Sequence, residues 1–477
     1  MNGLYTIAIV GGGVSGTLTA YHLVHRAPQA RVVVLDPRPG LGLGLAYSTP
    51  SLKHLLNVPA GKISALPDQP EHFLNWVRAH YDPSIQASDF APRAIFGKYI
   101  QSLIAASPRI EHLQTTVLDC HVKGPQATLD LADGTRLVAD AVVLATGNFD
   151  PAPLPGVNDQ AIRGGVYYHS AWEDATYANL PPEAPVILVG TGLTAVDVIL
   201  RLRETGHRGR ITAISRHGVF PCHHAPYEPL DNSVIGDKVP RKAHELLRAV
   251  HQAIKAGKPW RAVVDSLRAR TNEFWLALPL VEQKRFVRHL QRRWEVVRHR
   301  MAPPIADQIY SELLAGTLVK RQGRLHAILP HGEGAKVQFE LAGGEIAEIC
   351  AARVINCTGP AMNYRRVRSS LLNSLFAQGL ITAGPLGGGL WSDKHGALRA
   401  QDGSFSPLLF NAGPGRQGTL FESIAIPELR EQAVALADRL AAQAREAGAS
   451  AEYPLSAGPW SGNGQAQSKL TLVANQS

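Results

Sequence analysis

Three glycines near the start of the chain have the spacing that a bound pyrophosphate requires. Gly11, Gly13 and Gly16 form a GxGxxG pattern between the apolar run 5–10 and a stretch with helical periodicity. In such a loop the first glycine allows a tight turn, the second lets the backbone approach a phosphate, and the third lets the helix pack closely on the strand. The start of that helix, which contains Ser15, offers free N–H groups and a partial positive charge to an anion. The pattern therefore predicts a dinucleotide-binding loop.

A carboxylate follows at the distance expected for a ribose contact. Asp36 ends the apolar run 31–35, twenty residues after Gly16. From that position it can accept hydrogen bonds from ribose hydroxyls, so we expect the first site to bind FAD. The alternative is a glycine turn in another kind of α/β unit. The order of strand, glycine loop, helix, strand and acid favours the dinucleotide interpretation.

A second glycine pattern has a basic residue where the first has an acid. Gly190 and Gly192 open a GxGxxA pattern after the apolar run 186–189, and Thr194 lies at the start of the next helical stretch. The following apolar run leads into Arg216. An arginine there can bind a 2′-phosphate that a carboxylate would repel, so we expect the second site to bind NADPH. The alternative for Arg216 is a solvated loop charge.

Two Thr-Gly pairs indicate that the two sites belong to nested domains. Thr146-Gly147 and Thr358-Gly359 each follow a predicted hairpin and a short apolar run. Each pair lies where a chain would leave a dinucleotide-binding unit. We therefore predict an α/β fold with two Rossmann-like domains: a discontinuous FAD-binding domain (1–150 and 355–445) and an inserted NAD(P)H-binding domain (180–354).

The segment 241–316 interrupts this plan with a basic, helical insert. It holds 15 Lys and Arg against 7 Asp and Glu, so it carries +8 of the net charge of +9. Its clearest predicted helix is 281–300, with Phe286, Leu290, Trp294 and Val297 on one face. Three interpretations of the charge stay open: a solvated helical cap, attraction of NADPH phosphates or an acidic substrate, and nucleic-acid binding.

Composition sets the remaining expectations. No apolar run reaches the roughly 18–20 residues of a membrane helix, so we expect no membrane span. Four cysteines without a CxxC pattern indicate a reduced, cytoplasmic setting and argue against a disulfide reductase. Cys222-His223-His224 lacks the spacing of a zinc site, so no metal is expected. The alanine-rich segment 427–447 predicts a helix, and 448–477 a disordered tail.

These motifs resemble bacterial FAD/NAD(P)-binding proteins related to class B flavin-containing and N-hydroxylating monooxygenases. The resemblance spans about 5–440. Besides the glycine loops it rests on Gly44-Leu45-Ala46-Tyr47 and on the segments 54–60, 92–99, 299–303 and 421–425. It implies an FAD- and NADPH-dependent oxidoreductase, most simply a monooxygenase that N-hydroxylates a small amine or amino acid.

The resemblance also implies roles for single residues. Asn57 would lie beside the flavin, and Arg93 and Tyr99 in a flavin-contacting loop; from spacing alone these are turn and packing residues. The chain would return to the flavin near Gly413, and a helix starting near Gly418-Thr419 would direct its N-terminus toward the ring.

A partial monooxygenase signature lies between the two halves. The family pattern FxGxxxHxxx(Y/W/P) is matched by Gly165 and His169, but Arg163 replaces the phenylalanine and Trp172 comes one residue early. Asn57 and His169 are thus the candidate catalytic residues, with a structural histidine as the alternative for His169.

We expect a small-molecule substrate, and the basic insert would favour one that is negatively charged. Three functions remain open. They are the monooxygenase, an NAD(P)H:acceptor flavin oxidoreductase without oxygen insertion, and a flavoprotein that binds or modifies RNA through the insert. The insert's aromatic residues have core-like spacing, so RNA ranks last.

Overall fold

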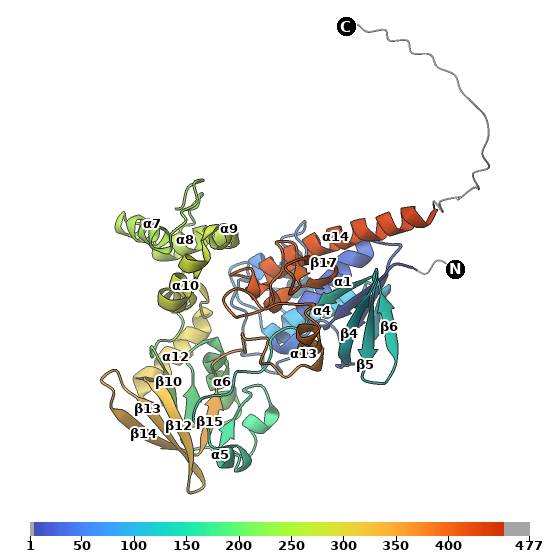
Figure 1. Cartoon of the computed structure of the whole chain (residues 1–477). Coiled ribbons are helices and arrows are strands. Elements are labelled where there is room, and N and C mark those ends of the chain that lie inside the picture. The colour runs from blue at the N-terminus through green and yellow to red at the C-terminus, as the bar shows by residue number, and fades with distance from the viewer. Residues whose placement is uncertain (1–3, 453–477) are drawn as a thin grey trace, which may run out of the picture.

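The first glycine loop belongs to a mostly parallel six-stranded sheet. In the computed structural model, which describes residues 4–452, this sheet has the order β16-β17-β7-β1-β2-β3 (Figure 1). Its strands are β1 (Thr6–Val10), β2 (Arg31–Leu35), β3 (Ile110–Leu113), β7 (Ala141–Leu144), β16 (Ala397–Arg399) and β17 (Phe405–Asn411). Strands β1, β2 and β7 are buried on both faces, which explains their unbroken apolar runs. Strand β17 comes from the end of the chain, so this unit is discontinuous as predicted.

Two layers cover the sheet. Helices α1 (Val14–Arg26) and α14 (Ile426–Glu452) pack together on one face. The other face meets a small antiparallel sheet and α13 (Ser370–Ala377). That small sheet consists of β4 (Val117–Lys123), β5 (Gln126–Leu131) and β6 (Arg136–Ala139). Helices α2 (Gly44–Tyr47), α3 (His72–His80) and α4 (Arg93–Ala105) complete the unit.

The second glycine loop belongs to a five-stranded parallel sheet of order β11-β10-β9-β15-β8. Its strands are β8 (Tyr167–Tyr168), β9 (Val186–Val189), β10 (Ile211–Ser215), β11 (Leu318–Gln322) and β15 (Arg353–Asn356). Helices α6 (Leu193–Glu204) and α12 (Pro303–Ala315) cover one face. The antiparallel sheet β12 (Arg324–His331), β13 (Gly334–Glu340) and β14 (Ile346–Ala351) covers the other. The two units thus repeat one plan, and the predicted α/β fold with two dinucleotide-binding domains is confirmed.

The sheets place some boundaries differently from the sequence expectation. Strand β8 and helix α5 (Asp159–Arg163) pack in the second unit, although they precede residue 180. Helix α12 packs in the core of the second unit rather than in the insert, because Ile305 and Ile309 face that core. A short strand such as β8 carries too little periodicity to be seen in the sequence.

The helical insert forms a separate lobe above the second unit, at the upper left of Figure 1. It contains α7 (Ala243–Lys255), α8 (Trp260–Ser266), α9 (Thr271–Ala277), α10 (Leu280–His289) and α11 (Gln291–Arg298). The single helix predicted over 281–300 is wrong, because the backbone at Leu290 (φ −118°) separates α10 from α11.

The end of the chain extends the predicted helix. Helix α14 continues through Glu452, so the expectation of disorder is wrong for 448–452, and 453–477 lie outside the described residues. No helix within residues 4–452 is long and apolar enough to cross a membrane.

Candidate functional site

The first glycine loop has room for glycine alone at two positions. Gly11 has φ +108°, and a Cβ atom there would lie 2.3 Å from the carbonyl oxygen of Ala145. A Cβ on Gly16 would lie 1.9 Å from the carbonyl oxygen of Gly11. Gly13 is the N-cap of α1, and because glycine has no side chain it does not cap the N–H groups of the first turn. The first turn of α1, which includes Ser15, could therefore hold a phosphate.

Asp36 lies below this loop and is held by two hydrogen-bond donors. Its carboxylate accepts from the N–H of Gly12 at 2.6 Å and forms an ion pair of 2.7 Å with Arg38. Burial would raise the pKa of Asp36, but the hydrogen bonds from Arg38 and Gly12 outweigh it and lower the pKa. The carboxylate is therefore charged and in place to accept from a ribose. Arg38 could not be predicted from the sequence, because its ion pair with Asp36 depends on how the chain turns after β2.

The second glycine loop repeats the geometry of the first. Gly190 has φ +126°, and a Cβ there would lie 2.3 Å from the carbonyl oxygen of Cys357. The same close approach occurs between Gly11 and the carbonyl oxygen of Ala145 in the first loop. Gly192 is the N-cap of α6, and nothing lies within 4 Å of where its Cβ would be. Arg216 is exposed just after β10. This loop also fits a pyrophosphate.

The two Thr-Gly pairs follow the strands that face these loops. Gly147 and Gly359 both have positive φ, +71° and +85°. Thr358 donates its hydroxyl to Asn356, and Thr146 is half-buried after β7. Each pair thus follows the strand whose end carbonyl lies against a glycine loop.

A cavity of about 310 Å³ lies between the two units. Its wall includes four of the predicted cofactor-binding residues: Asn57, Arg93, Thr194 and Gly359. It also includes the first turn of α6, the segment 148–151, Trp172, Arg298-His299 and Ile424–Ile426. Residues from both dinucleotide-binding units, the insert and the start of α14 therefore meet at one space.

A buried ion pair joins the two units beside this cavity. Arg93 on α4 donates to both carboxylate oxygens of Asp197 on α6, at 2.7 and 3.1 Å. Arg93 also donates to the carbonyl oxygen of Leu55, and a ring nitrogen of His54 lies 3.0 Å from the carbonyl oxygen of Asp197. Asp197 was missed, although a carboxylate on the apolar face of a helix is a signal of such a partner.

Two predicted residues lie away from the cavity wall. Tyr99 is fully buried against Phe73 and Phe96, and its hydroxyl contacts the N–H of Ala65 and a ring nitrogen of His72. Burial raises its pKa to about 12. His169 contacts the hydroxyl of Tyr167 at 3.2 Å, while Trp172, three residues later, reaches the cavity. A flavin contact by either residue stays a prediction.

The return of the chain to the first unit differs in part from the expectation. Gly413 (φ +78°) packs on Ser15, so the C-terminal segment reaches the first glycine loop. Gly418 packs on Leu390, and Thr419 exchanges hydrogen bonds with Ser392. The α-helix expected to start near 418–419 instead starts at Ile426, because a short 3-10 helix and an irregular segment precede it. Its first residue lines the cavity.

The insert is attached to this return segment by buried charges. Arg298 donates to both carboxylate oxygens of Glu422, at 2.9 and 2.6 Å, and both side chains are 8% exposed. Asn272 accepts from the N–H groups of Phe421 and Glu422. The motif segments 299–303 and 421–425 are therefore neighbours in space.

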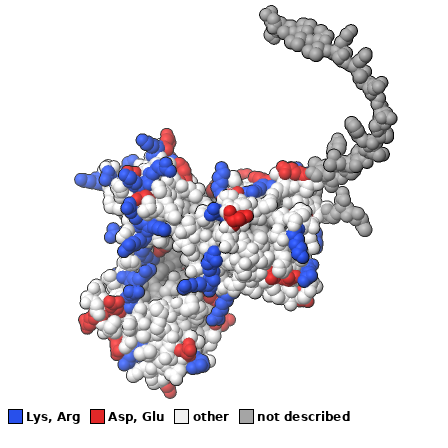
Figure 2. Space-filling view, in the orientation of Figure 1, with Lys and Arg blue, Asp and Glu red and all other residues white. Residues whose placement is uncertain are grey.

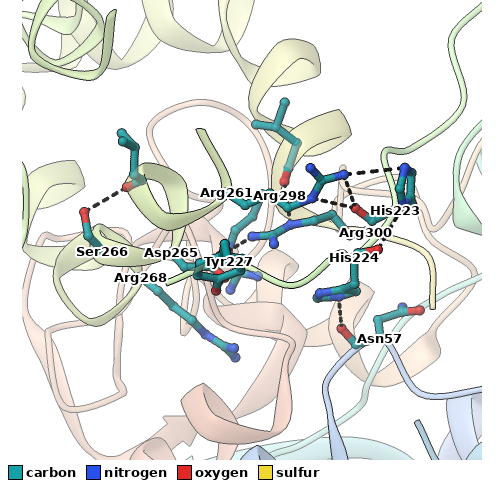
Figure 3. Close-up of polar contacts among 12 residues, drawn as sticks. Asn57, His223, His224, Tyr227, Arg261, Asp265, Ser266, Arg268, Arg298 and Arg300 are labelled. Carbon is teal, nitrogen blue, oxygen red and sulfur yellow. Dashed lines mark hydrogen bonds and ion pairs between the residues drawn. The ribbon is translucent and has the colours of Figure 1, made fainter. Parts of the chain in front are cut away.

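Two histidines at this junction are held neutral. A ring nitrogen of His224 lies 3.0 Å from the carbonyl oxygen of Asn57, which ties the segment between β10 and the insert to the first unit (Figure 3). Burial, with Arg300 nearby, lowers the pKa of His224 to about 4. Burial and the adjacent Arg298 lower the pKa of His299 to about 4. Both rings can act at neutral pH only as uncharged hydrogen-bonding groups.

One arginine of the insert touches the second glycine loop. Arg292 donates to the carbonyl oxygen of Val219 at 2.7 Å and to the hydroxyl of Thr191 at 3.3 Å. Thr191 lies between Gly190 and Gly192. Figure 2 shows Lys and Arg gathered on the insert lobe and along the hollow beside it. The basic charge therefore lies beside the predicted NADPH site.

Within residues 4–452, one group has the ligand geometry of a metal site: Asp119, His121 and Asp130, on β4 and β5. Asp130 already pairs with Arg136 at 2.7 Å. The group lies on the small antiparallel sheet, whose residues are not part of the cavity wall. His223 and His224 bond to different partners instead of sharing a ligand position.

The comparisons with known proteins agree with this geometry. Residues 8–149 match the FAD-NAD(P)-binding family. These residues include the first glycine loop, most of strand β1 and the strands β2, β3 and β7 of the first sheet. A ferredoxin–NADP reductase of Salinispora tropica is 28% identical over 221 residues, which cover 46% of this chain and 57% of that protein. The chain spans about half the length of the curated relatives that it matches first.

Solved structures extend the likeness beyond residues 8–149. Ornithine hydroxylase of Pseudomonas aeruginosa has a TM-score of 0.61 and 15% identity, over 92% of this chain and 99% of that one. The cadaverine monooxygenase of Erwinia amylovora has a TM-score of 0.62 and 14% identity, over 98% and 100%. At these identities the likeness concerns the fold: two dinucleotide-binding units in a flavoenzyme arrangement.

Proposed function

We propose that the chain is an FAD- and NADPH-dependent monooxygenase that N-hydroxylates a small amine. One observation carries the proposal: a single cavity is walled by the start of α6, by Asn57 and by the start of α14. A nicotinamide bound through the second glycine loop and a flavin bound through the first would both reach it. The flavin would supply hydride acceptance and oxygen activation when bound.

The protein's own side chains define what can happen in that cavity. Arg93 and Asp197 fix α4 against α6, so they would hold the two cofactor sites in register. The free N–H groups at the start of α14 would favour negative charge on whatever lies in front of them. Leu56, Val58, Ile63 and Phe149 contribute apolar wall, which excludes water from a reactive centre.

Asn57 and His299 are the uncharged polar groups that could orient a substrate amine. Asn57 lines the cavity and its backbone carbonyl is held by His224. His299 is neutral at physiological pH because burial and Arg298 lower its pKa to about 4. An amine nucleophile must itself be uncharged to react, and a neutral imidazole can accept a hydrogen bond from it without taking its proton.

The test combines cofactor content with product analysis. Purified protein should contain FAD and should be bleached by NADPH without oxygen. In air, NADPH oxidation with lysine, ornithine, aspartate or a diamine should consume oxygen and yield a hydroxylamine. Release of all consumed oxygen as hydrogen peroxide with every amine would contradict the monooxygenase.

The second candidate is an NAD(P)H:acceptor oxidoreductase, which the ferredoxin–NADP reductase relatives favour. In this case NADPH would reduce the flavin quickly, oxygen would react slowly, and ferredoxin would accept the electrons. Disulfide exchange through Cys120 or Cys357 has less support, because burial raises the pKa of the Cys120 thiol to about 12 and that of Cys357 higher still.

The RNA alternative has no stacking platform in the insert. Trp260, Phe274, Trp275 and Trp294 line the apolar cavity of the insert instead of forming a row of rings on an outer face. Single-strand binding uses aromatic rings that are open to bases. We therefore expect no nucleic-acid partner. Protein purified at moderate salt should show no absorbance at 260 nm beyond that of protein and cofactors.

A further inference from the structure

A second cavity, which the cofactor chemistry does not use, lies inside the helical insert. It measures about 290 Å³, and its lining comes from the helices α7 to α11, the turns between them, Ile235 and Phe421. Leu246, Val264, Phe274, Trp275, Leu290 and Trp294 are among the residues that form its wall. This volume is near the lower end of small-molecule sites, which run from about 300 to 1,000 Å³.

The cavity is larger than packing defects in a protein interior. Protein cores are close-packed, and their voids seldom exceed one water molecule. An apolar cavity of this size is a poor place for water, because water needs polar partners there. The side chain of Ile254 is 38% exposed although it lines the cavity, so the space reaches the surface along α7.

Polar groups at this cavity are cationic or hydrogen-bond donors. Arg293 and His251 line it and are exposed, so they lie at its mouth. Arg293 forms no ion pair with any residue in the described part of the chain. The buried Nε1 of Trp294 has no acceptor. Among the described residues of the lining, none is Asp or Glu.

The cavity adjoins the cofactor cavity without being part of it. Val297 and Phe421 line the insert cavity, whereas Arg298 and Ile424 line the cofactor cavity. The buried pair between Arg298 and Glu422 lies between these two sets. The ring of Phe421 packs on Trp275 at a centroid distance of 4.9 Å, which closes this wall.

We propose that the insert cavity binds an amphipathic carboxylate. The alkyl or aryl body of the ligand lies among the aromatic side chains, and its carboxylate lies at the mouth beside Arg293 and His251. A chain of about ten carbons matches a site of this size and supplies the apolar burial that drives binding. The site needs neither flavin nor NADPH, so it stands apart from the proposed reaction.

Calorimetric titration of the cofactor-loaded protein with decanoate tests the proposal. We expect one molecule bound per chain with a negative heat-capacity change, the sign of apolar burial. Decanamide, which has the same body without the charge, should bind about three- to tenfold more weakly. Arg293→Gln should weaken decanoate by the same factor and leave decanamide unchanged, whereas Arg248→Gln, exposed on α7 outside the lining, should change neither.

A cavity-filling variant gives an independent result. Leu247→Trp places a larger side chain in the lining and should abolish decanoate binding, whereas Leu314→Trp, at a position 90% exposed on α12, should not. If Leu247→Trp does not fold, the Arg293→Gln comparison still decides. Absence of saturable binding, or unchanged binding in a folded Leu247→Trp, overturns the proposal. So does a dimer in sedimentation that Leu247→Trp dissociates, because a second copy would then cover this face.

Discussion

At the scale of single residues, the two glycines of the second loop should respond differently to the same change. Gly190→Ala places a Cβ 2.3 Å from the carbonyl oxygen of Cys357 in a left-handed conformation, so we expect at least about 2 kcal/mol loss of unfolding free energy. Gly192→Ala meets no atom within 4 Å, so stability should change by less than about 1 kcal/mol. Its methyl group would instead enter the space in front of α6 and raise the KM for NADPH about tenfold. Urea unfolding and steady-state kinetics separate the two, and equal destabilisation would contradict this account.

Arg292 is the arginine of the insert that should matter for NADPH. It donates hydrogen bonds to Thr191 and Val219 at the second glycine loop. Arg292→Ala therefore removes a positive charge and two hydrogen bonds that hold the loop where the phosphates would bind. We expect the KM for NADPH to rise about five- to tenfold, the effect of one charged hydrogen bond. Arg288→Ala is the matched control, since Arg288 is exposed on the preceding helix α10. A similar rise in both variants would indicate only the general field of the insert.

Residue types could be predicted from the sequence wherever a local pattern required them. Gly11, Gly16 and Gly190 are fixed by close backbone contacts inside recognisable loops, and Asp36 by its distance from Gly16. Contacts that cross the fold left no such pattern. The bond between His224 and Asn57 joins residues 167 positions apart. Nothing in the local sequence of either residue points to the other.

At the scale of elements, the pair Arg93–Asp197 should be the main polar link between α4 and α6. The two side chains are 12% and 4% exposed, so removing one leaves a buried charge unpaired. Asp197→Asn should cost about 3–5 kcal/mol of unfolding free energy. Arg208→Ala, which breaks a pair that is about 70% exposed, should cost less than about 1 kcal/mol. Chemical unfolding of both variants decides, and equal losses would remove the special role of the buried pair.

The contact between His224 and the first unit should make stability fall in acid. Burial and Arg300 lower the pKa of His224 from 6.5 to about 4, so between these values the unfolded chain binds a proton that the folded protein does not. The contribution of the neutral His224 ring to the free energy of unfolding is fully present above pH 6.5. It is lost as the pH falls toward 4, at up to about 1.4 kcal/mol per pH unit. His224→Gln should reduce that slope and keep a donor for Asn57. The curves of wild type and variant should run parallel above about pH 8; parallel curves over the whole range would contradict the prediction.

Elements were predictable where their periodicity was long and undisturbed. The central strands, α1, α6 and α14 have such patterns. The break at Leu290 could not be predicted from the apolar pattern, because α10 and α11 both direct their apolar residues into the insert cavity. These residues are Phe286, Leu290, Trp294 and Val297. Helix α14 starts at Ile426, one residue before the alanine-rich segment 427–447, whereas the helix start that the family resemblance implied near 418–419 falls at the end of a glycine-rich 3-10 turn.

At the scale of the whole molecule, the net charge of +9 is concentrated where the second cofactor would approach. The segment 241–316 carries +8 of it, and Figure 2 shows basic side chains beside the hollow between the lobes. A field of this kind raises the local concentration of anions and their rate of association. It is screened by salt, since the Debye length falls from about 10 Å at 0.1 M to about 3 Å at 1 M.

Salt should therefore weaken NADPH capture more than NADH capture. NADPH carries an extra phosphate, so the KM for NADPH should rise more steeply between about 0.05 and 0.3 M salt, a range over which screening becomes strong. Arg292→Ala should flatten the NADPH curve toward that of NADH, because the contact at Thr191 is lost. Sucrose at matched osmolality controls for changes in water activity. Identical salt slopes for the two nucleotides would place the basic charge away from the 2′-phosphate, and the insert would then be a solvated cap whose chemistry lies in its apolar cavity alone.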